Sequence, residues 1–598
     1  MQQSAKRIAE NASLQAFLNS YIRETNEGSI LPVSLLNQDH HSTLLQSELF
    51  LEIQLPKQQD SLRIEVWYQS LVGRHTFGTV LKGNAHTGWV EQETLLVFIT
   101  LIQELHFESV QKGGAVQSCF DECLVRMLES YHTMCTYLEQ RLATDENIHD
   151  PKQSFIEAEQ SLLFGHWLHP TPKSRQGMAF WQHAAYAPEL RGTFQLYYFY
   201  VHHTLIQQES IADERVWDIV HENGECSDLD EKWFPFPMHP LQAYYLRDQP
   251  HVKQAIKDGL IQDKGPLGEH FTATSSLRTV YHEKSSWMYK FSIPVKVTNS
   301  LRVNKQHELR AGILVAKLIK AGAWQSDTCQ FITDPAYMNV SFPNIKESGF
   351  ETIIRCNPFK DGGEGITSIA ALVQDPIPGS DSKLAAIIKR RAKQEHQSVR
   401  VISEKWFRHY LENAIMPLIS LYDELGIALE AHQQNSLLDL KNDYPKTYYY
   451  RDNQGYYLAT SYRGRLLSQE PELEEAEGLF YEDEEINNRF TYYLFMNQIF
   501  GIIHRFGVDG LMDEWQLVQI LRTRLEQSGQ NYKGAGRRFV QGLLTNETLA
   551  FKANLLTRFH DVDELAEALE QAVYVNIKNP LLQKNATEVH HEQTIQAT

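Results

Sequence analysis

Long hydrophobic runs are absent from this sequence of 598 residues. A membrane-spanning helix needs about 18 or more consecutive apolar residues, and no stretch approaches that length. The N-terminal segment has the pattern of an amphipathic helix and lacks the continuous apolar centre of a secretion signal. We therefore expect a cytoplasmic protein that makes no contact with a membrane.

Cysteine is also scarce, with six residues in the chain. Cys119 and Cys123 are separated by one helical turn, but no second cysteine pair or histidine cluster completes a zinc site. We expect buried, reduced thiols. The six are Cys119, Cys123, Cys135, Cys226, Cys329 and Cys356.

Positive charge is in deficit: 56 Lys and Arg residues face 75 Asp and Glu residues, a net charge of -19. Proteins bind nucleic acids and anionic membranes by neutralising phosphate groups with Lys and Arg. We therefore expect neither a nucleic acid nor a membrane as a partner. The hydrophobic share of 42% is ordinary for a soluble globular protein. The chain is too long for a single hydrophobic core, and we expect two to four domains.

Several well-known catalytic motifs are missing as well. The sequence has no G-x-x-x-x-G-K-[ST] loop, no strand-linked G-x-G-x-x-G, no G-x-S-x-G, no H-E-x-x-H and no kinase signature set. The glycine-rich segment 361–365 includes acidic residues where a phosphate would need bare amides, so it predicts a turn.

Helical periodicity dominates the first part of the chain. Apolar residues recur at three- and four-residue spacing over residues 94–110 and 118–142, and a polar segment at 145–151 predicts a domain boundary. A further long helix is predicted over residues 404–425, ending at Gly426. A short strand at 427–435 and a hairpin that turns at 452–455 should follow it.

The clearest strand is predicted over residues 285–303, where apolar and polar residues alternate. The apolar positions are Trp287, Tyr289, Phe291, Ile293, Val295 and Val297. Alternation would place Lys290, Thr298 and Arg302 together on the accessible face. Pro294 within the run indicates an edge strand or a bulge.

Cations and hydroxyl groups gather around this strand. Ser276, Arg278 and Thr279 precede it, and Lys290 and Arg302 lie on it. Point charges and a guanidinium fork are what a triphosphate requires, so the pattern favours an anion site over a solvated surface.

A second group of polar residues could hold a metal ion. In strand geometry Glu430, His432 and Gln434 share a face, and Asp452 would return beside them in the predicted hairpin. Magnesium in proteins usually takes one or two carboxylates and keeps several waters. The alternative is a His and a Glu that cap a sheet edge.

Two proline-rich segments have other polar residues. Residues 159–177 include His166, His169, Lys173, Ser174 and Arg175, which suit an anion site or a charged surface loop. In residues 234–242, three prolines surround His239, which predicts a stiff buried turn with a hydrogen-bonded histidine.

Five motifs occur in a fixed order: H-P-x-x-K-S-R-x-G at 169–177, P-x-H-P-x-Q at 237–242, S-x-R-T at 276–279, K-x11-R at 290–302 and E-x-H-x-Q-N at 430–435. Together they resemble the IucA/IucC-type siderophore synthetases. The resemblance implies an α+β multi-domain cradle, usually dimeric. It implies a helical thumb (1–150), fingers with an antiparallel sheet (151–345) and a mixed α/β palm (346–598).

The resemblance also implies a reaction. ATP and Mg²⁺ would convert a carboxylate, typically one arm of citrate, into an acyl-adenylate. An amine or hydroxyl would then displace AMP and form an amide or ester of a siderophore, for iron acquisition. The resemblance does not choose between free citrate, an amidated citrate and another dicarboxylate, nor between diamines, hydroxylated amines and alcohols.

Site residues follow by position from the resemblance. The ATP phosphates would be held by Ser276, Arg278, Thr279, Lys290 and Arg302. The acid would contact His169, Thr298, Arg302, His432, Gln434 and Asn435. Glu430 and Asp452 would hold Mg²⁺, and Arg302, His432 and Lys290 would be catalytic. Two alternatives stay open: a kinase-like phosphotransferase and a non-catalytic anion-binding relative.

Overall fold

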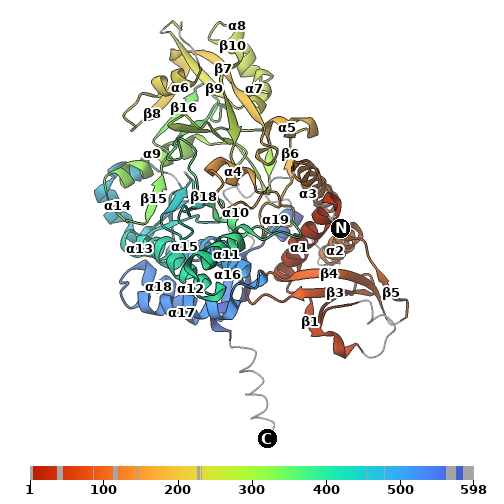
Figure 1. Ribbon diagram of the computed structural model, residues 1–598. Helices are drawn as coiled ribbons and strands as arrows, with labels where there is room; N and C mark the ends of the chain where they lie inside the picture. The colour runs from red at the N-terminus through yellow and green to blue at the C-terminus, as the bar shows by residue number, and fades with distance from the viewer. Residues whose placement is uncertain are drawn as a thin grey trace.

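The computed structural model describes residues 4–36, 45–84, 86–111, 119–144, 147–224, 229–230, 232–322, 324–452, 454–476, 478–560 and 574–583. It is a mixed α/β protein with several sheets, most of them antiparallel (Figure 1). This confirms the predicted class. No helix in the described ranges is long and apolar enough to cross a membrane.

The N-terminal part contains the predicted helices and, in addition, a sheet that the sequence patterns did not predict. Helices α1 (Ala5–Thr25), α2 (Thr94–Gln111) and α3 (Cys119–Leu142) pack together beside a five-stranded antiparallel sheet (Figure 1). The strands are β1 (Ser29–Pro32), β2 (Leu49–Leu55), β3 (Asp60–Tyr68), β4 (Thr76–Asn84) and β5 (Gly88–Glu91). Alternating burial along β2 and β3 is the two-residue period that the helical prediction overlooked.

The middle of the chain forms an eight-stranded antiparallel sheet, in the order β8-β16-β17-β12-β11-β10-β7-β9. This confirms the antiparallel sheet predicted there. The strands are β7 (Thr193–His202), β8 (Ile206–Ser210), β9 (Trp233–Met238), β10 (Ile261–Ala273), β11 (Thr279–Tyr281), β12 (Trp287–Lys290), β16 (Ala336–Val340) and β17 (Thr352–Cys356). Thr279 and Lys290 are direct partners across β11 and β12, near the centre of the sheet.

The strand predicted over 285–303 is broken where Pro294 suggested. After β12, the chain leaves the large sheet and forms β13 (Lys296–Val297) and β14 (Ser300–Leu301), which pair in a small sheet with β6 (Arg175–Gln176). Lys290 and Ser292 are buried like their apolar neighbours, so the predicted accessible face does not exist. Its polar residues are instead divided between a strand and a turn.

The C-terminal part is mixed α/β, as predicted. The helix expected at 404–425 runs through α12 (Val399–Tyr410), the π-helical segment η6 (Leu411–Ile415) and α13 (Met416–Leu425), and ends at Gly426 with a φ of 66°. One sheet contains β15 (Cys329–Ile332), β18 (Ile366–Ser368), β20 (Ser436–Asp439) and β21 (Tyr448–Arg451). A second contains β19 (Ile427–Leu429), β22 (Tyr456–Ala459) and β23 (Phe480–Tyr481).

The predicted hairpin with its turn at 452–455 is wrong. β21 pairs with β20 and β15, while β22 pairs with β19 and β23, so the turn at 452–455 connects two different sheets. The buried Tyr448 and Tyr456 share one large core with the surrounding helices. Packing against distant segments therefore outweighs pairing between sequence neighbours.

The remaining helices cover the sheets. They are α4 (Phe155–Gln160), α5 (His183–Tyr186), α6 (Val216–Gly224), α7 (Pro240–Arg247), α8 (Pro250–Lys257), α9 (Gln306–Lys320), α10 (Ile369–Val373), α11 (Lys383–Glu395), α14 (Arg463–Gln469), α15 (Asp483–Phe490), the π-helical η9 (Thr491–Ile499), α16 (Phe500–Val508), α17 (Glu514–Gly529), α18 (Ala535–Thr545) and α19 (Asn554–Phe559). β24 (Thr548–Lys552) and β25 (Tyr574–Lys578) form a last antiparallel pair, with α19 between them in the chain. Helix α19 packs against α1, so this late helix shares the core of the N-terminal part (Figure 1).

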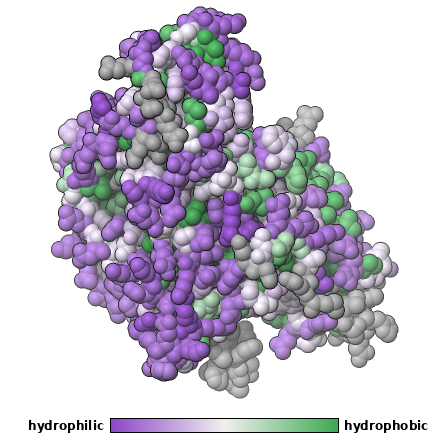
Figure 2. Space-filling model, turned by 45° about the horizontal axis from the view of Figure 1, so that its top comes forward, coloured by the Kyte–Doolittle hydropathy of each residue, from purple (hydrophilic) through white to green (hydrophobic). Residues whose placement is uncertain are grey.

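The surface and the thiols agree with the composition. The face in Figure 2 is mainly hydrophilic, with scattered apolar residues. Of the cysteines whose side chains are described, Cys123 and Cys329 are buried, and Cys135 and Cys356 are half-buried. The predictions for the Cys119 side chain and for Cys226 lie outside the described residues.

Candidate active site

A buried ion pair lies at the centre of the predicted site. Lys290, at the end of β12, donates to Asp452 with Nζ 2.8 Å from Oδ1, and only 6% and 13% of the two side chains are exposed. Burial lowers the pKa of Lys290 to about 8, although Asp452 opposes the shift. Burial alone would raise the pKa of Asp452, but Lys290 and the nearby Arg355 hold it well below its usual range.

Arg278 adds a second buried cation beside this pair. It donates to Asn304 Oδ1 at 2.8 Å and approaches Gln454 Oε1 at 3.4 Å. Burial, reinforced by the charge of Arg302, lowers its pKa to about 10, so it stays protonated at neutral pH. The β10–β11 turn holds the hydroxyl groups: Ser276 Oγ accepts from the Thr279 amide at 3.1 Å. Thr279 Oγ1 is buried without a protein partner.

The residues 430–435 form a loop between β19 and β20, not the strand that was predicted. The Nδ1 atom of His432 accepts from the backbone amides of Gln434 (3.2 Å) and Asn435 (3.3 Å). Burial, together with the neighbouring His166, lowers the pKa of His432 to about 3. The imidazole is therefore neutral, and its proton is on Nε2. Nε2 lies 3.8 Å from Glu430 Oε1.

Glu430 and Asp452 meet around Gly455. A Cβ atom at Gly455 would lie 2.6 Å from Glu430 Cβ and 3.2 Å from Asp452 Oδ2, so only glycine lets the two segments approach this closely. No cluster of three or more possible metal ligands occurs in the described ranges. Two carboxylates fit Mg²⁺ nonetheless, because magnesium takes few protein ligands and completes its shell with water and phosphate oxygens.

Arg302 and Thr298 are joined in the β13–β14 hairpin. Arg302 Nη2 donates to Thr298 Oγ1 and to the Val297 carbonyl, both at 3.1 Å. The guanidinium is close enough to Arg278 and His432 to lower the pKa of each. The structure therefore brings Arg302 to the other predicted residues, although a turn and not a strand face positions it.

His169 reaches the site from the segment before β6. It is 3% exposed, and its Nδ1 accepts from the Thr171 amide at 3.1 Å. Its ring lies 6.1 Å from that of His166, which in turn influences His432. Gln434 Nε2 donates to Ser275 Oγ at 3.2 Å, and Asn435 Nδ2 is 3.4 Å from Asp452 Oδ2. All the predicted site residues thus belong to one connected region.

Lys173 and Arg175 correct the anion-site interpretation of residues 159–177. Both are buried and share Glu189 at 2.5 Å, and Arg175 also donates to the Tyr137 hydroxyl at 2.8 Å. These cations form a structural cluster with an internal counter-charge. His239 likewise matches the structural interpretation, because it caps α7 through the Leu241 amide.

Sequence reasoning missed the residues that connect the segments of the site. Buried Arg451 donates to Glu159 (2.8 and 2.9 Å) and to the Gln434 carbonyl (2.8 Å), and Ser275 Oγ donates to Glu159 Oε2 at 2.7 Å. The signals available were a lone Glu near an apolar stretch and a lone Arg after a tyrosine-rich strand. Neither identifies its partner.

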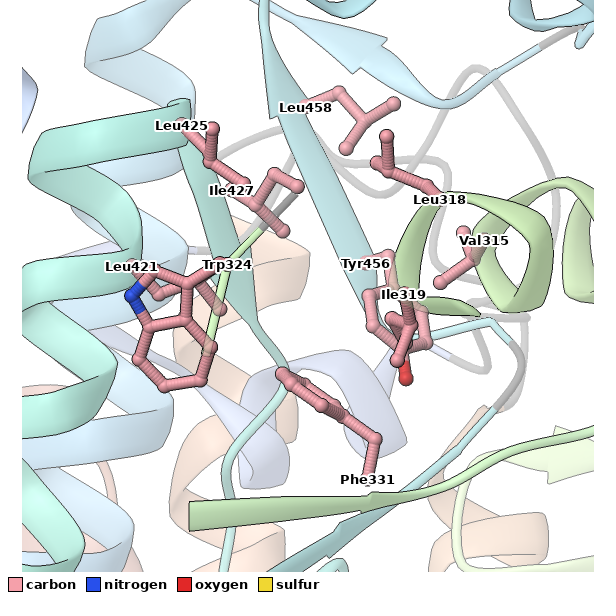
Figure 3. Close-up of a pocket in the computed structure, with 10 residues that line it drawn as sticks. All are labelled: Val315, Leu318, Ile319, Trp324, Phe331, Leu421, Leu425, Ile427, Tyr456 and Leu458. Atoms are coloured by element: carbon pink, nitrogen blue, oxygen red, sulfur yellow. The ribbon is translucent and has the colours of Figure 1, made fainter. Parts of the chain in front are cut away.

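An apolar cavity lies elsewhere, between α9, α13, β19 and β22 (Figure 3). Its volume is about 20 Å³, and side chains such as Leu318, Trp324 and Leu425 line it. A space this small and apolar cannot hold a nucleotide or a polyanionic acid. The polar region around Lys290 and Asp452 is the candidate active site.

Comparisons with known proteins identify the family. A model described as "IucA / IucC family" matches residues 154–374, and one described as "Ferric iron reductase FhuF-like transporter" matches residues 404–567. A spermidine-citrate ligase of Bacillus anthracis is 40% identical, over 97% of this chain and 99% of that protein. This chain belongs to the IucA/IucC family of siderophore synthetases. The resemblance predicted from the motifs is thereby confirmed.

Further siderophore synthetases agree with this assignment. The rhizobactin siderophore biosynthesis protein RhbC of Rhizobium meliloti is 31% identical, over 91% of this chain and 94% of that protein. The structure of ATP-bound aerobactin synthetase IucA from Klebsiella pneumoniae superimposes with a TM-score of 0.85 at 25% identity, covering 96% of this chain and 100% of that one. The chain is therefore a ligase of siderophore biosynthesis, and the kinase-like and non-catalytic alternatives are not favoured.

Proposed function

We propose that this synthetase uses ATP and Mg²⁺ to adenylate a carboxylate of citrate and then joins the acyl group to an amine of a polyamine such as spermidine. The choice of substrates is supported by the 40% identity to a spermidine-citrate ligase over almost the full length of both chains. The observation that carries the chemistry is the convergence of Arg278, Lys290 and Arg302 beside two carboxylates in one region.

ATP would bind with its phosphates against Lys290, Arg278, Ser276 and Thr279. Lys290 and Arg278 supply charge, and the buried Thr279 hydroxyl, which has no protein partner, is available as a donor. Arg302 would lie between the phosphates and the acid. Screening both anions at once lets a citrate carboxylate oxygen attack the α-phosphorus, with pyrophosphate as the leaving group.

Glu430 and Asp452 would hold Mg²⁺. When bound, the cation neutralises phosphate charge and stabilises the departing pyrophosphate. The two residues fit this task because their segments come together at Gly455 and Asp452 lies beside Lys290, where the phosphates would bind. Asn435, close to Asp452 Oδ2, would help to orient that carboxylate.

Citrate would bind against His169, Thr298, Arg302, His432, Gln434 and Asn435. His432 is neutral with a proton on Nε2, so it would donate a hydrogen bond to a citrate oxygen. In this protonation state it orients the acid and does not accept the proton that the amine loses. The amine nitrogen would attack the acyl carbon and release AMP.

Three broader features belong to the same proposal. The parts at 1–150, 151–345 and 346–598 would act as thumb, fingers and palm of a cradle around this site. The enzyme would be a homodimer and would work in the cytoplasm, where ATP and citrate are available. Sedimentation analysis tests the dimer independently of activity.

ATP-dependent trapping with hydroxylamine tests the function. The purified protein is incubated with ATP, Mg²⁺ and hydroxylamine together with citrate, succinate, α-ketoglutarate or mono-amidated citrate, and hydroxamate, AMP and pyrophosphate are measured. We expect turnover with citrate, and amide formation when spermidine replaces hydroxylamine. Activity only with an amidated citrate would make this a second-arm ligase, while ADP formation would overturn adenylation.

A further inference from the structure

The turn that leads into Arg302 has an unusual backbone. Two residues, Thr298 and Asn299, connect β13 to β14, and Thr298 has a φ of 56°. Glycine usually occupies such a position, because a β-branched side chain is disfavoured at positive φ. Strain of this kind persists only where the surrounding structure imposes it.

The hydroxyl of Thr298 connects this strained turn to Arg302 in the active site. Its Oγ1 donates to the Val297 carbonyl at 2.6 Å and accepts from Arg302 Nη2 at 3.1 Å. Arg302 Nη2 also donates to the Val297 carbonyl. The guanidinium is therefore aimed by the turn itself, and a change in the turn would redirect Arg302.

Arg558, at the end of α19, imposes the turn. It is 1% exposed, and it donates twice to Asn299 Oδ1 (3.0 and 2.7 Å) and once to the Thr298 carbonyl (2.7 Å). The buried Arg126 of α3 approaches the same carbonyl at 3.4 Å. Two arginines from distant parts of the sequence thus hold a turn of two residues.

Helix α19 also contacts the segment that leads to His169 in the acid site. Asn554 Nδ2 donates at 3.1 Å to the carbonyl of Leu168, which precedes His169. Glu24 of α1 accepts from the Leu556 amide at 2.9 Å, and the buried Leu555 joins the core of the N-terminal part. Helix α19 is therefore anchored independently of the site.

We propose that α19 positions the acid-binding groups: Arg558 fixes the turn that aims Arg302, and Asn554 fixes the segment that carries His169. This inference rests on the proposed function, because it takes Arg302 and His169 as contacts of the carboxylic acid. Arg558 is a positioning residue, since it holds the turn and would act on the acid through Arg302.

The variant Arg558→Lys tests the proposal, because lysine keeps the charge but cannot reproduce the planar fork. We expect the KM for citrate to rise about tenfold or more and the KM for ATP to change less than about twofold, as for a displaced binding group. Arg390→Lys is the control: Arg390, on α11, forks onto Asp443, and neither residue belongs to the predicted site. It should leave both KM values unchanged.

A double variant shows whether Arg558 acts through Arg302. Citrate affinity is measured by calorimetry with a non-hydrolysable ATP analogue. If the effect passes through Arg302, Arg558→Lys weakens citrate binding about tenfold in the parent protein but less than about twofold when Arg302→Lys is already present. Additive losses would overturn the proposal.

The outcomes separate this proposal from the proposed function. If the parent enzyme forms no hydroxamate from citrate, the proposed function fails. If the parent is active but Arg558→Lys leaves the KM for citrate unchanged, only the positioning role fails. Should Arg558→Lys not fold, Asn299→Ala removes the acceptor from the other side of the contact, and it should produce the same selective rise in the KM for citrate.

Discussion

The buried pair of Lys290 and Asp452 makes a quantitative prediction about stability. The two charges are 2.8 Å apart and are 6% and 13% exposed. Removing one member of a buried pair costs about 3–5 kcal/mol, because the remaining charge stays desolvated. We expect Asp452→Asn to lower the free energy of unfolding by about 3 kcal/mol, at the lower end because Asp452 retains some contact with water.

Removing both charges should restore most of the loss. The double variant Lys290→Met with Asp452→Asn leaves no charge behind, so its loss should stay below about 1 kcal/mol. Unfolding in urea, followed by circular dichroism, gives the four free energies of the cycle. The control pair Lys389 and Asp381 is 49% and 47% exposed, and neutralising one member should cost less than about 1 kcal/mol. If the double variant loses as much as the two single variants added together, the reasoning is refuted.

The same pair predicts the pH dependence of nucleotide binding. Lys290 has a pKa of about 8, so it is charged and can bind phosphate below that pH and loses its charge above it. ATP affinity should therefore fall as the pH rises through 8. In Asp452→Asn the loss of the counter-charge moves the fall to lower pH, which calorimetric titration between pH 6.5 and 9.5 would detect.

Three further predictions concern single side chains. Arg302→Ala should abolish hydroxamate formation while the unfolding transition stays intact; near-normal turnover in a folded variant would remove Arg302 from the mechanism. Glu430→Gln should raise the Mg²⁺ concentration for half-maximal rate about tenfold or more, since even the loss of a residue that only orients a metal ligand typically costs that much, and an unchanged metal profile would place the cation elsewhere. Burial raises the pKa of Glu24 to about 8, so stability falls as the pH rises from 4.5 toward 8, by about 1.4 kcal/mol per pH unit. In Glu24→Gln, unfolding measured at pH 6 and pH 7.5 should lack this loss.

Local sequence patterns predicted the long elements and failed for the short ones. The helices at 94–110 and 404–425 were predictable because their apolar residues repeat over several turns. Residues 430–435 are too few to show a period, and they form a loop. One of the two partners of β21 is β15, which lies far earlier in the chain, so no local pattern could specify that pairing.

In the candidate site, too, some residues could be predicted from the sequence and others could not. Motif residues such as Lys290 and His432 stand out because polar groups follow one another in a fixed order. Arg451 and Glu159 do not stand out, because a buried contact between segments that are remote in sequence produces no pattern near either residue. At Lys173 the sequence suggested a site for an external anion. The charge of Lys173 is instead compensated by the buried Glu189, which could not be recognised as its partner from the sequence.

The cations of the site have protein partners before any substrate binds. Lys290 is paired with Asp452, Arg278 with Asn304, and Arg302 with Thr298. Each partner accepts a hydrogen bond in place of the water that the cation loses in the folded protein. A magnesium–nucleotide complex would offer Lys290 a phosphate and Asp452 a cation in the same event, so neither buried charge would lose its counter-charge. ATP without the metal would compensate Lys290 but leave Asp452 beside phosphate oxygens of like charge. The pair therefore predicts tighter binding of the complex than of either component alone.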